Sequence, residues 1–201
     1  MKKIVLASTS PYRKSLLKRL AIPFEAQKPT FDEDLYASTQ QAPKANPVLW
    51  AQTLAFLKAQ SLVGPGLTVI GADQLVSFQG QILGKPKTRE NAIIQLEKMQ
   101  NQTHELITAV CVLDDGTREF KHEFVNITKL TLRKLSRIQI ENYVNLDQPL
   151  DCAGAYKIES HGIALIQDLD TQDPTAIEGL PLIQLLAILK ECGYESFNGT
   201  A

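Results

Sequence analysis

The opening stretch of the chain constrains the fold most, because it joins a strand directly to the start of a helix. Residues 2–7, Lys-Lys-Ile-Val-Leu-Ala, are rich in aliphatic and β-branched side chains, which predicts a short buried strand. Ser10 suits the N-cap of a helix, and Pro11 suits its first position, where a missing N–H costs nothing. Apolar side chains recur at helical spacing from Leu16 onward, so this segment predicts a strand followed by a helix.

The turn between this strand and helix could bind an anion. Free backbone N–H groups and the helix dipole favour negative charge there, and Ser8 and Ser10 add hydroxyls. Arg13 adds a bidentate cation on the first helical turn. Phosphate is the anion that such a turn binds most often, but an ordinary capped helix start is the alternative.

Composition narrows the class of protein. A chain of 201 residues suits one domain, or two closely packed lobes, with a real hydrophobic core. The net charge of −1 argues against a broad nucleic-acid surface. The 3 cysteines lack metal-ligand spacing and are typical of reduced thiols in a cytosolic protein. The apolar run at the N-terminus is too short for a signal peptide or a membrane span.

Strands and helices alternate along the chain. We expect strands at residues 2–7, 24–26, 67–73, 105–113, 119–132 and 162–166, with a hairpin signal at 114–116 and a loop at 29–46. We expect helices at 11–20 and 47–62, after Thr88 and Ser136, and from Leu180 to a stop at Gly193. This order predicts an α/β or α+β fold with a mixed sheet.

Two acidic residues are candidate ligands or bases. Asp73 is expected to end an apolar strand after two small residues, and ligands in α/β sheets gather at such strand ends. A carboxylate there could bind Mg²⁺ or remove a proton from water, although a capping aspartate is the alternative. Glu33 alone would be a solvated loop charge, but paired with Asp73 it could complete a metal site that also uses substrate phosphates.

Two lysines and one glutamate carry further hypotheses. Lys85 lies between Gly84 and Pro86, which suits a fixed turn and a phosphate ligand. Lys58, on a helix with an apolar face, would ordinarily extend its charge into solvent. Residues 151–159 pass from small side chains into a strand-like segment, where Glu159 could accept hydrogen bonds from a base edge. A tight turn and a surface strand are the simpler interpretation of that segment.

Several common sites are absent from the sequence. The 3 histidines show no ligand spacing, and there is no G-x-S-x-G motif, which argues against a zinc site or a serine hydrolase triad. There is also no Walker A motif and no G-x-G-x-x-G motif, so nothing supports a P-loop or Rossmann protein.

An ordered set of segments resembles the Maf family of nucleoside triphosphate pyrophosphatases. The matching segments are Leu6–Arg13 with Leu16–Leu17, Asp32–Glu33, Lys58–Ala59, Gly71–Gln74, Gly84–Pro86, Thr108–Val110, Ala153–Tyr156 and Gly179–Leu182. They follow the family's order and span nearly the whole chain. Each motif is weak alone, but the ordered combination is highly specific.

The resemblance implies a single domain over residues 1–201 with an elongated α/β fold, similar to inosine triphosphate pyrophosphatases. In that fold a central mixed sheet carries a cleft between two lobes. The family's reaction is hydrolysis of the α–β phosphoanhydride of a nucleoside triphosphate, giving a monophosphate and pyrophosphate, with a divalent cation (Mg, Mn or Co). The resemblance also implies a possible homodimer, while the composition indicates a cytoplasmic protein with no nucleic-acid or membrane partner.

The resemblance assigns roles by matching position. Asp73 would be the general base and, with Glu33, a metal ligand; Ser8, Ser10, Arg13, Lys58 and Lys85 would bind the phosphates. A triphosphate carries about four negative charges, which such cations and N–H groups would offset.

Three positions would select the base: Tyr12, Gln74 and Glu159. They resemble the 7-methyl-GTP group of the family, which has an aromatic residue, Gln and Glu there, although tryptophan is common where this chain has tyrosine. An aromatic ring can stack on a cationic methylated guanine, and a carboxylate can accept its N–H groups. The alternatives are a dTTP/UTP pyrophosphatase, whose group carries Arg, Thr and Gln, and a nucleotide-binding regulator of cell division or septum formation.

Overall fold

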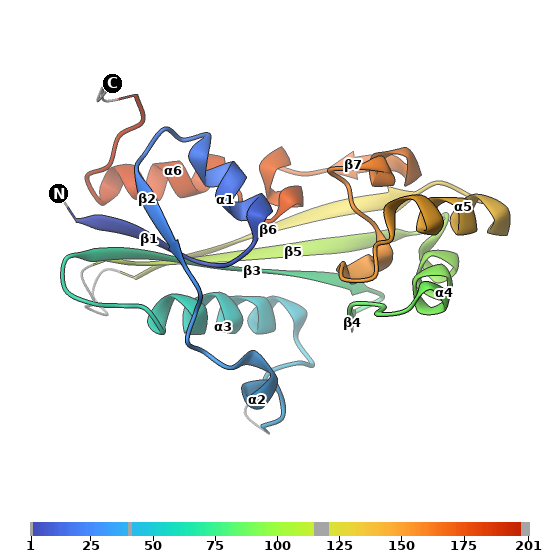
Figure 1. The fold of residues 1–201 in the computed structure, drawn as a ribbon, viewed down its shortest axis with the longest axis horizontal. Coiled ribbons are helices and arrows are strands. Elements are labelled where there is room, and N and C mark those ends of the chain that lie inside the picture. Colours follow the sequence, from blue (N-terminus) through green and yellow to red (C-terminus); the bar gives the residue numbers. More distant parts are fainter. Residues whose placement is uncertain (1, 40–41, 115–120, 198–201) are drawn as a thin grey trace. The chain divides into compact units, whose positions relative to one another are not determined.

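A computed structural model describes residues 2–39, 42–114 and 121–197 (Figure 1). The fold is a mixed α/β fold whose chain divides into two compact units. Unit 1 comprises Met1–Gln74, Thr108–Asn126 and Asp173–Ala201, and unit 2 comprises Leu75–Ile107 and Ile127–Gln172. Three long strands contribute residues to both units: β3 (Leu67–Phe78), β5 (Thr103–Asp114) and β6 (Lys121–Leu132).

Unit 1 is built on strands in the order β2-β1-β3-β5-β6. Its other elements are β1 (Lys3–Ala7), α1 (Pro11–Lys18), β2 (Phe24–Gln27), α2 (Glu33–Ala37), α3 (Pro47–Gln60), the 3-10 helix η4 (Pro174–Glu178) and α6 (Leu182–Glu191). β1 pairs in parallel with both β2 and β3, and α3 lies across the sheet from α1 and α6 (Figure 1).

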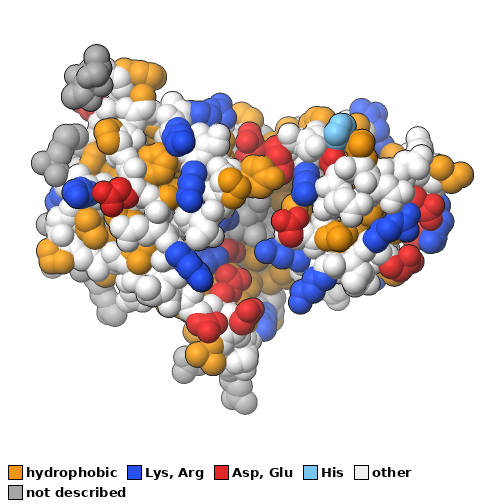
Figure 2. All heavy atoms as spheres, in the orientation of Figure 1, with side chains coloured by type: hydrophobic (Ala, Val, Ile, Leu, Met, Phe, Trp, Pro, Cys, Tyr) orange, Lys and Arg blue, Asp and Glu red, His pale blue; other side chains and the backbone are white. Residues whose placement is uncertain are grey.

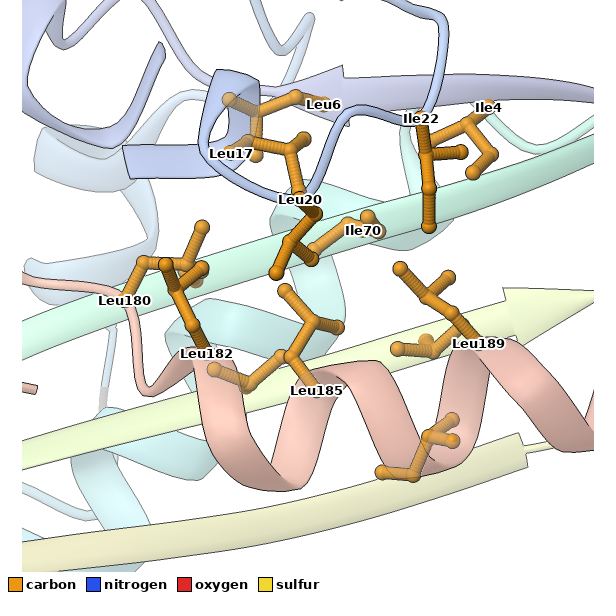
Figure 3. Close-up of a cluster of buried hydrophobic side chains, with 14 of the residues drawn as sticks. Ile4, Leu6, Leu17, Leu20, Ile22, Ile70, Leu180, Leu182, Leu185 and Leu189 are labelled. Atoms are coloured by element: carbon orange, nitrogen blue, oxygen red, sulfur yellow. The ribbon is translucent and has the colours of Figure 1, made fainter. Parts of the chain in front are cut away.

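The core of unit 1 explains why its helices form where they do. Leucines recur along α1 and α6 at helical spacing, and they meet the apolar side chains of β1 and β3 in one cluster (Figure 3). Leu17 and Leu185 lie in this cluster and are almost fully buried. Side-chain caps fix the helix starts: Ser10 accepts from the backbone N–H of Arg13, and Asn46 accepts from that of Leu49.

Unit 2 has its own strands and core. Its strand order is β4-β3-β5-β6-β7, with β4 (Gln81–Leu83) antiparallel to β3 and β7 (Ile166–Asp170) antiparallel to β6. α4 (Arg89–Met99) packs against α5 (Arg137–Asp147), and a complete capping box between Ser136 and Gln139 starts α5. Two 3-10 helices, η2 (Ala153–Ala155) and η3 (His161–Leu165), follow α5.

Most of the expected elements are confirmed, and four are wrong. β3 does not end at Asp73 but continues to Phe78, because Val76, Ser77 and Phe78 pair with the antiparallel strand β4. The expected loop at 29–46 contains α2, which Asp32 caps by accepting from the N–H of Leu35. The expected strand at 162–166 is mostly η3, and the strand-like part of 151–159 is a turn. Residues 115–116 of the hairpin signal lie outside the described residues.

Two surface observations bear on partners. On the face that Figure 2 shows, basic and acidic side chains of the described residues are interspersed rather than gathered by sign, as a net charge of −1 suggests. Within the described part of the chain, no helix has both the length and the apolar character that crossing a membrane requires.

Candidate functional site

The centre of the candidate site is a lysine that bridges two carboxylates in unit 1. Lys58, on α3, donates from Nζ to Oδ1 of Asp73 on β3 at 2.6 Å. The same Nζ lies 2.9 Å from Oε2 of Glu33 on α2. Asp73 is buried, with 8% of its side chain exposed, whereas 47% of the Glu33 side chain is exposed. The structure therefore brings together three residues that lie far apart in the sequence.

Close packing of α3 on β3 makes this contact possible. A Cβ on Gly71 would lie 2.1 Å from the carbonyl oxygen of Ala55 and 2.7 Å from the backbone nitrogen of Ala59. Only glycine therefore allows the helix backbone to approach the strand this closely. Since Lys58 precedes Ala59 on α3 and Asp73 follows Gly71 by two residues on β3, the approach brings the two side chains together.

Aromatic stacking positions the second carboxylate. Tyr36 of α2 stacks on Trp50 of α3, with ring centroids 5.8 Å apart and an interplanar angle of 10°. Phe31 contacts the same tyrosine edge to face at 5.7 Å. These contacts hold the short helix α2, and with it Glu33, against α3. The sequence signal for this packing is two aromatic residues, Phe31 and Tyr36, in an otherwise polar stretch that was expected to be a loop.

The environment of Asp73 suits a base or a cation ligand. Burial raises the pKa of its carboxyl above the ordinary value, while the charges of Lys58 and Arg13 and the hydrogen bond from Lys58 act in the opposite direction. Its second oxygen, Oδ2, is buried without a hydrogen-bond partner. A buried, unsatisfied carboxylate oxygen is costly in a folded protein, and such groups are concentrated at functional sites.

Arg13 supplies a second cation at the end of the first turn of α1. Its Nε donates to the carbonyl oxygen of Gly179 at 3.0 Å, which ties α1 to the segment after η4. Burial lowers the pKa of its guanidinium, while the negative charges of Asp73 and Glu33 raise it. A guanidinium stays charged in proteins, so it can bind a phosphate oxygen.

The two serines of the opening turn each accept a hydrogen bond from a backbone N–H group further along the chain. Ser8 Oγ accepts from the backbone N–H of Ser10 at 3.1 Å, and Ser10 Oγ accepts from that of Arg13 at 3.4 Å. Each hydroxyl acts as an acceptor in these bonds and retains its own hydrogen as a donor. This arrangement is compatible with an anion at the start of α1, as the sequence predicts.

The specificity candidates of unit 1 differ in their surroundings. Tyr12 is exposed on α1, with 42% of the residue accessible to solvent. Gln74, next to Asp73 on β3, donates from Nε2 to Oγ1 of Thr108 at 2.9 Å and to the carbonyl oxygen of Ala176 in η4 at 2.8 Å. These bonds use the amide nitrogen, so a contact between Gln74 and a ligand would use its oxygen.

Two candidates belong to unit 2. Lys85 is exposed in the segment that follows β4, and Glu159 is exposed in the turn at 158–160. The other predicted residues all belong to unit 1: Ser8, Ser10, Tyr12, Arg13, Glu33, Lys58, Asp73 and Gln74.

The carboxylates of unit 1 fit a metal ion that takes most of its ligands from water and substrate phosphates. Among the described residues there is no group of three or more His, Cys, Asp or Glu side chains that could hold a metal ion. Glu33 and Asp73 provide two carboxylates that already share one cation, Lys58. Mg²⁺ is commonly bound by one or two carboxylates with water and substrate phosphates, and Asp73 Oδ2 is an unused ligand for it.

The fold and this site define a mixed α/β protein with a buried carboxylate beside two cations, an arrangement suited to an anionic ligand. The chain matches the family described as "Maf-like protein" over residues 3–192, and it belongs to that family. It is 51% identical to the "7-methyl-GTP pyrophosphatase" of Bdellovibrio bacteriovorus, over 94% of this chain and 96% of that protein. It is 42% identical to the "7-methyl-GTP pyrophosphatase" of a Polaromonas species, over 96% of this chain and 86% of that protein.

Among solved structures, the chain is similar to the Staphylococcus aureus Ham1 protein, with a TM-score of 0.49 and 16% identity over 96% of this chain and 100% of that chain. The Ham1 protein of Coxiella burnetii gives a TM-score of 0.47 and 14% identity over 95% of this chain and 100% of that chain.

Proposed function

We propose that this protein is a nucleoside triphosphate pyrophosphatase whose preferred substrate is 7-methyl-GTP. The observation that carries the proposal is Asp73, a buried carboxylate with a raised pKa and an unpartnered oxygen, held beside Lys58. Family membership supports the same reaction class, and relatives at 51% and 42% identity carry the name 7-methyl-GTP pyrophosphatase.

Asp73 acts as the general base in this proposal. It takes a proton from water while the water oxygen forms a bond to the α-phosphorus. The bond from that phosphorus to the α–β bridging oxygen breaks, and pyrophosphate leaves with its electron pair. The raised pKa of Asp73 brings the carboxyl nearer to the working pH, which makes it a stronger base than a solvated aspartate.

Cations offset the charge of the triphosphate. We assign Arg13, Lys58 and Lys85 to phosphate oxygens, with the hydroxyls of Ser8 and Ser10 as neutral donors. Glu33 and Asp73 would hold a divalent cation (Mg, Mn or Co), which supplies charge neutralisation at the phosphates when it is bound. When the carboxylates hold the metal, Lys58 can turn from them to a phosphate oxygen.

Base selection involves Tyr12, Gln74 and Glu159 in this proposal. The exposed ring of Tyr12 can stack on a methylated, cationic guanine. The exposed carboxylate of Glu159 can accept the guanine N–H groups, which a pyrimidine cannot offer in the same pattern. We further propose that residues 1–201 act as one functional domain in the cytoplasm, where its free cysteines stay reduced, and that a homodimer is possible.

The test is pyrophosphate release from a panel of nucleoside triphosphates with Mg²⁺, Mn²⁺ or Co²⁺. We expect 7-methyl-GTP to give the highest kcat/KM and Asp73→Asn to abolish most of it. Dominant hydrolysis of dTTP or UTP would instead establish the pyrimidine alternative, and Glu159→Gln with Gln74→Thr should move the wild-type preference in that direction. A division phenotype that survives in an inactive Asp73→Asn strain would favour a binding role over catalysis.

A further inference from the structure

The turn that carries Glu159 is tied to the last residue of α5, within unit 2. Asp147 accepts from the backbone N–H of His161 at 3.1 Å through Oδ2. Its other oxygen, Oδ1, accepts from the hydroxyl of Ser160 at 3.0 Å and lies 2.6 Å from Nδ1 of His161. Both oxygens of one buried carboxylate are therefore used to hold the two residues that follow Glu159.

The residue on the other side of the turn is held by the same helix. Tyr143, one turn earlier on α5, accepts at its hydroxyl from the backbone N–H of Lys157 at 2.8 Å. The Nζ of Lys157 donates to the backbone carbonyl of Asp147 at 3.1 Å. Because α5 makes hydrogen bonds to the chain both before and after Glu159, the position of this exposed side chain depends on α5.

The turn itself leaves little freedom. The backbone N–H groups of Ser160 and Gly162 both donate to the carbonyl oxygen of Lys157, at 3.1 and 2.9 Å. A Cβ on Gly162 would lie 2.4 Å from that oxygen, so the closure requires glycine. A closed turn with fixed ends can present one side chain in a defined direction.

The charge state of Asp147 suits this task. Burial raises the pKa of its carboxyl, but hydrogen bonds from His161, Ser160 and Tyr143 outweigh burial, and the pKa lies below its ordinary value. The carboxylate therefore remains ionised and accepts strong, charge-assisted hydrogen bonds.

We propose that Asp147 is a positioning residue for base selection, acting through the turn at 157–162 to place Glu159 against the purine of the substrate. This inference rests on the proposed function, since it assigns a support to the carboxylate that would recognise the base. Asp147 itself touches no substrate. Displacement of a recognising group by about 1 Å can cost as much as a hundredfold in rate, so loosening this turn should alter substrate choice.

The experiment compares Asp147→Asn with Asp168→Asn, a matched change at an exposed position of β7 in the same unit. Steady-state kcat and KM are measured for 7-methyl-GTP and for UTP, with Mg²⁺. We expect Asp147→Asn to raise KM for 7-methyl-GTP and to lower the ratio of kcat/KM between 7-methyl-GTP and UTP by about tenfold or more. Asp168→Asn should leave this ratio unchanged.

Tyr143→Phe provides a second route, because it removes only a hydroxyl, which accepts from the backbone N–H of Lys157 and also hydrogen-bonds to Asp147. We expect a smaller shift of the ratio in the same direction. A ratio unchanged in both folded variants, while Glu159→Gln does change it, would overturn the positioning role and leave the proposed function intact. If the wild-type protein releases no pyrophosphate from 7-methyl-GTP, the proposed function and this inference are both wrong.

Discussion

Asp73 in unit 1 and Asp147 in unit 2 are both buried aspartates, with 6% and 9% of the residue exposed, yet their pKa values shift in opposite directions. Burial raises the pKa of Asp73, and the charges of Lys58 and Arg13 with the single hydrogen bond from Lys58 do not reverse this. Burial acts on Asp147 in the same sense, but its hydrogen bonds prevail and lower the pKa.

The difference lies in how many partners each carboxylate has. Asp147 uses both oxygens on neighbouring groups of the chain, whereas Oδ2 of Asp73 has no partner. A satisfied buried carboxylate stabilises the local structure, while an unsatisfied one is a cost that a function can explain. The unmet hydrogen bond of Asp73, together with its deeper burial, therefore distinguishes the candidate base from the positioning residue.

The largest expected effect is on Asp73. Asp73→Asn should lower kcat by roughly a thousandfold, the range of general-base catalysis. Because the pKa is raised in the folded protein, ionisation of Asp73 costs stability progressively as the pH rises from the ordinary aspartate pKa to the raised value, and in full above it. We therefore expect the melting temperature of the Asp73→Asn variant at pH 8 to be equal to or above that of the wild type. A marked loss of stability with activity retained would contradict the contrast with Asp147.

His104 of unit 2 is a third buried titratable group. It tests whether burial that shifts a pKa also makes the stability of the fold depend on pH. Burial lowers the pKa of His104 from 6.5 to about 4, with Nε2 paired to the hydroxyl of Tyr156 and Nδ1 unpartnered. Between about pH 6.5 and pH 4, His104 binds a proton in the unfolded chain but remains neutral in the folded protein. The free energy of unfolding should fall between pH 6.5 and 4, by about 3 kcal/mol in total.

Urea titrations at several pH values would measure this effect. His104→Gln removes the titrating group and keeps a partner for Tyr156, so the fall over this pH range should become clearly shallower. An equally steep fall in the variant would assign the pH dependence to other groups.

Asp147→Asn should destabilise the folded protein, whereas Asp73→Asn should not. Loss of the charge-assisted bonds to the 160–161 segment should lower the free energy of unfolding at pH 7 by roughly 1.5–3 kcal/mol. Because the pKa of Asp147 is lowered in the folded protein, the stabilisation is present above about pH 4 and is lost as the pH falls further. Equal stability of variant and wild type at pH 7 would remove the distinction between the two carboxylates.

The smallest expected effect tests the packing that supports Asp73. Gly71→Ala places a methyl group against the backbone of α3 and should cost roughly 1–3 kcal/mol of stability. It should also lower activity, since α3 must move and carry Lys58 away from Asp73. Gly64→Ala is the control, because its Cβ would meet only Leu67 Cδ1 at 3.6 Å. Full activity in a folded Gly71→Ala protein would mean that catalysis does not require the contact between Lys58 and Asp73.

Local patterns predicted many of the elements. Apolar spacing and capping residues located α1, α3, α4 and α5 within a few residues, because these signals act over one or two helical turns. The extent of β3 beyond Asp73 was missed, since a charge inside a strand looks like its end until Lys58 is known to neutralise it. The helix α2 was missed because tertiary stacking of Tyr36 on Trp50 stabilises an otherwise polar segment.

The sequence by itself determined the family, the alternation of strands and helices and the identity of the candidate residues. Only the tertiary structure decided that Lys58 bridges Glu33 and Asp73, that Asp73 retains an unused oxygen and that Asp147 grips the Glu159 turn. The physical reason is range. Caps and periodicity depend on neighbours along the chain, whereas burial, pKa and ion pairing depend on groups that only folding brings together.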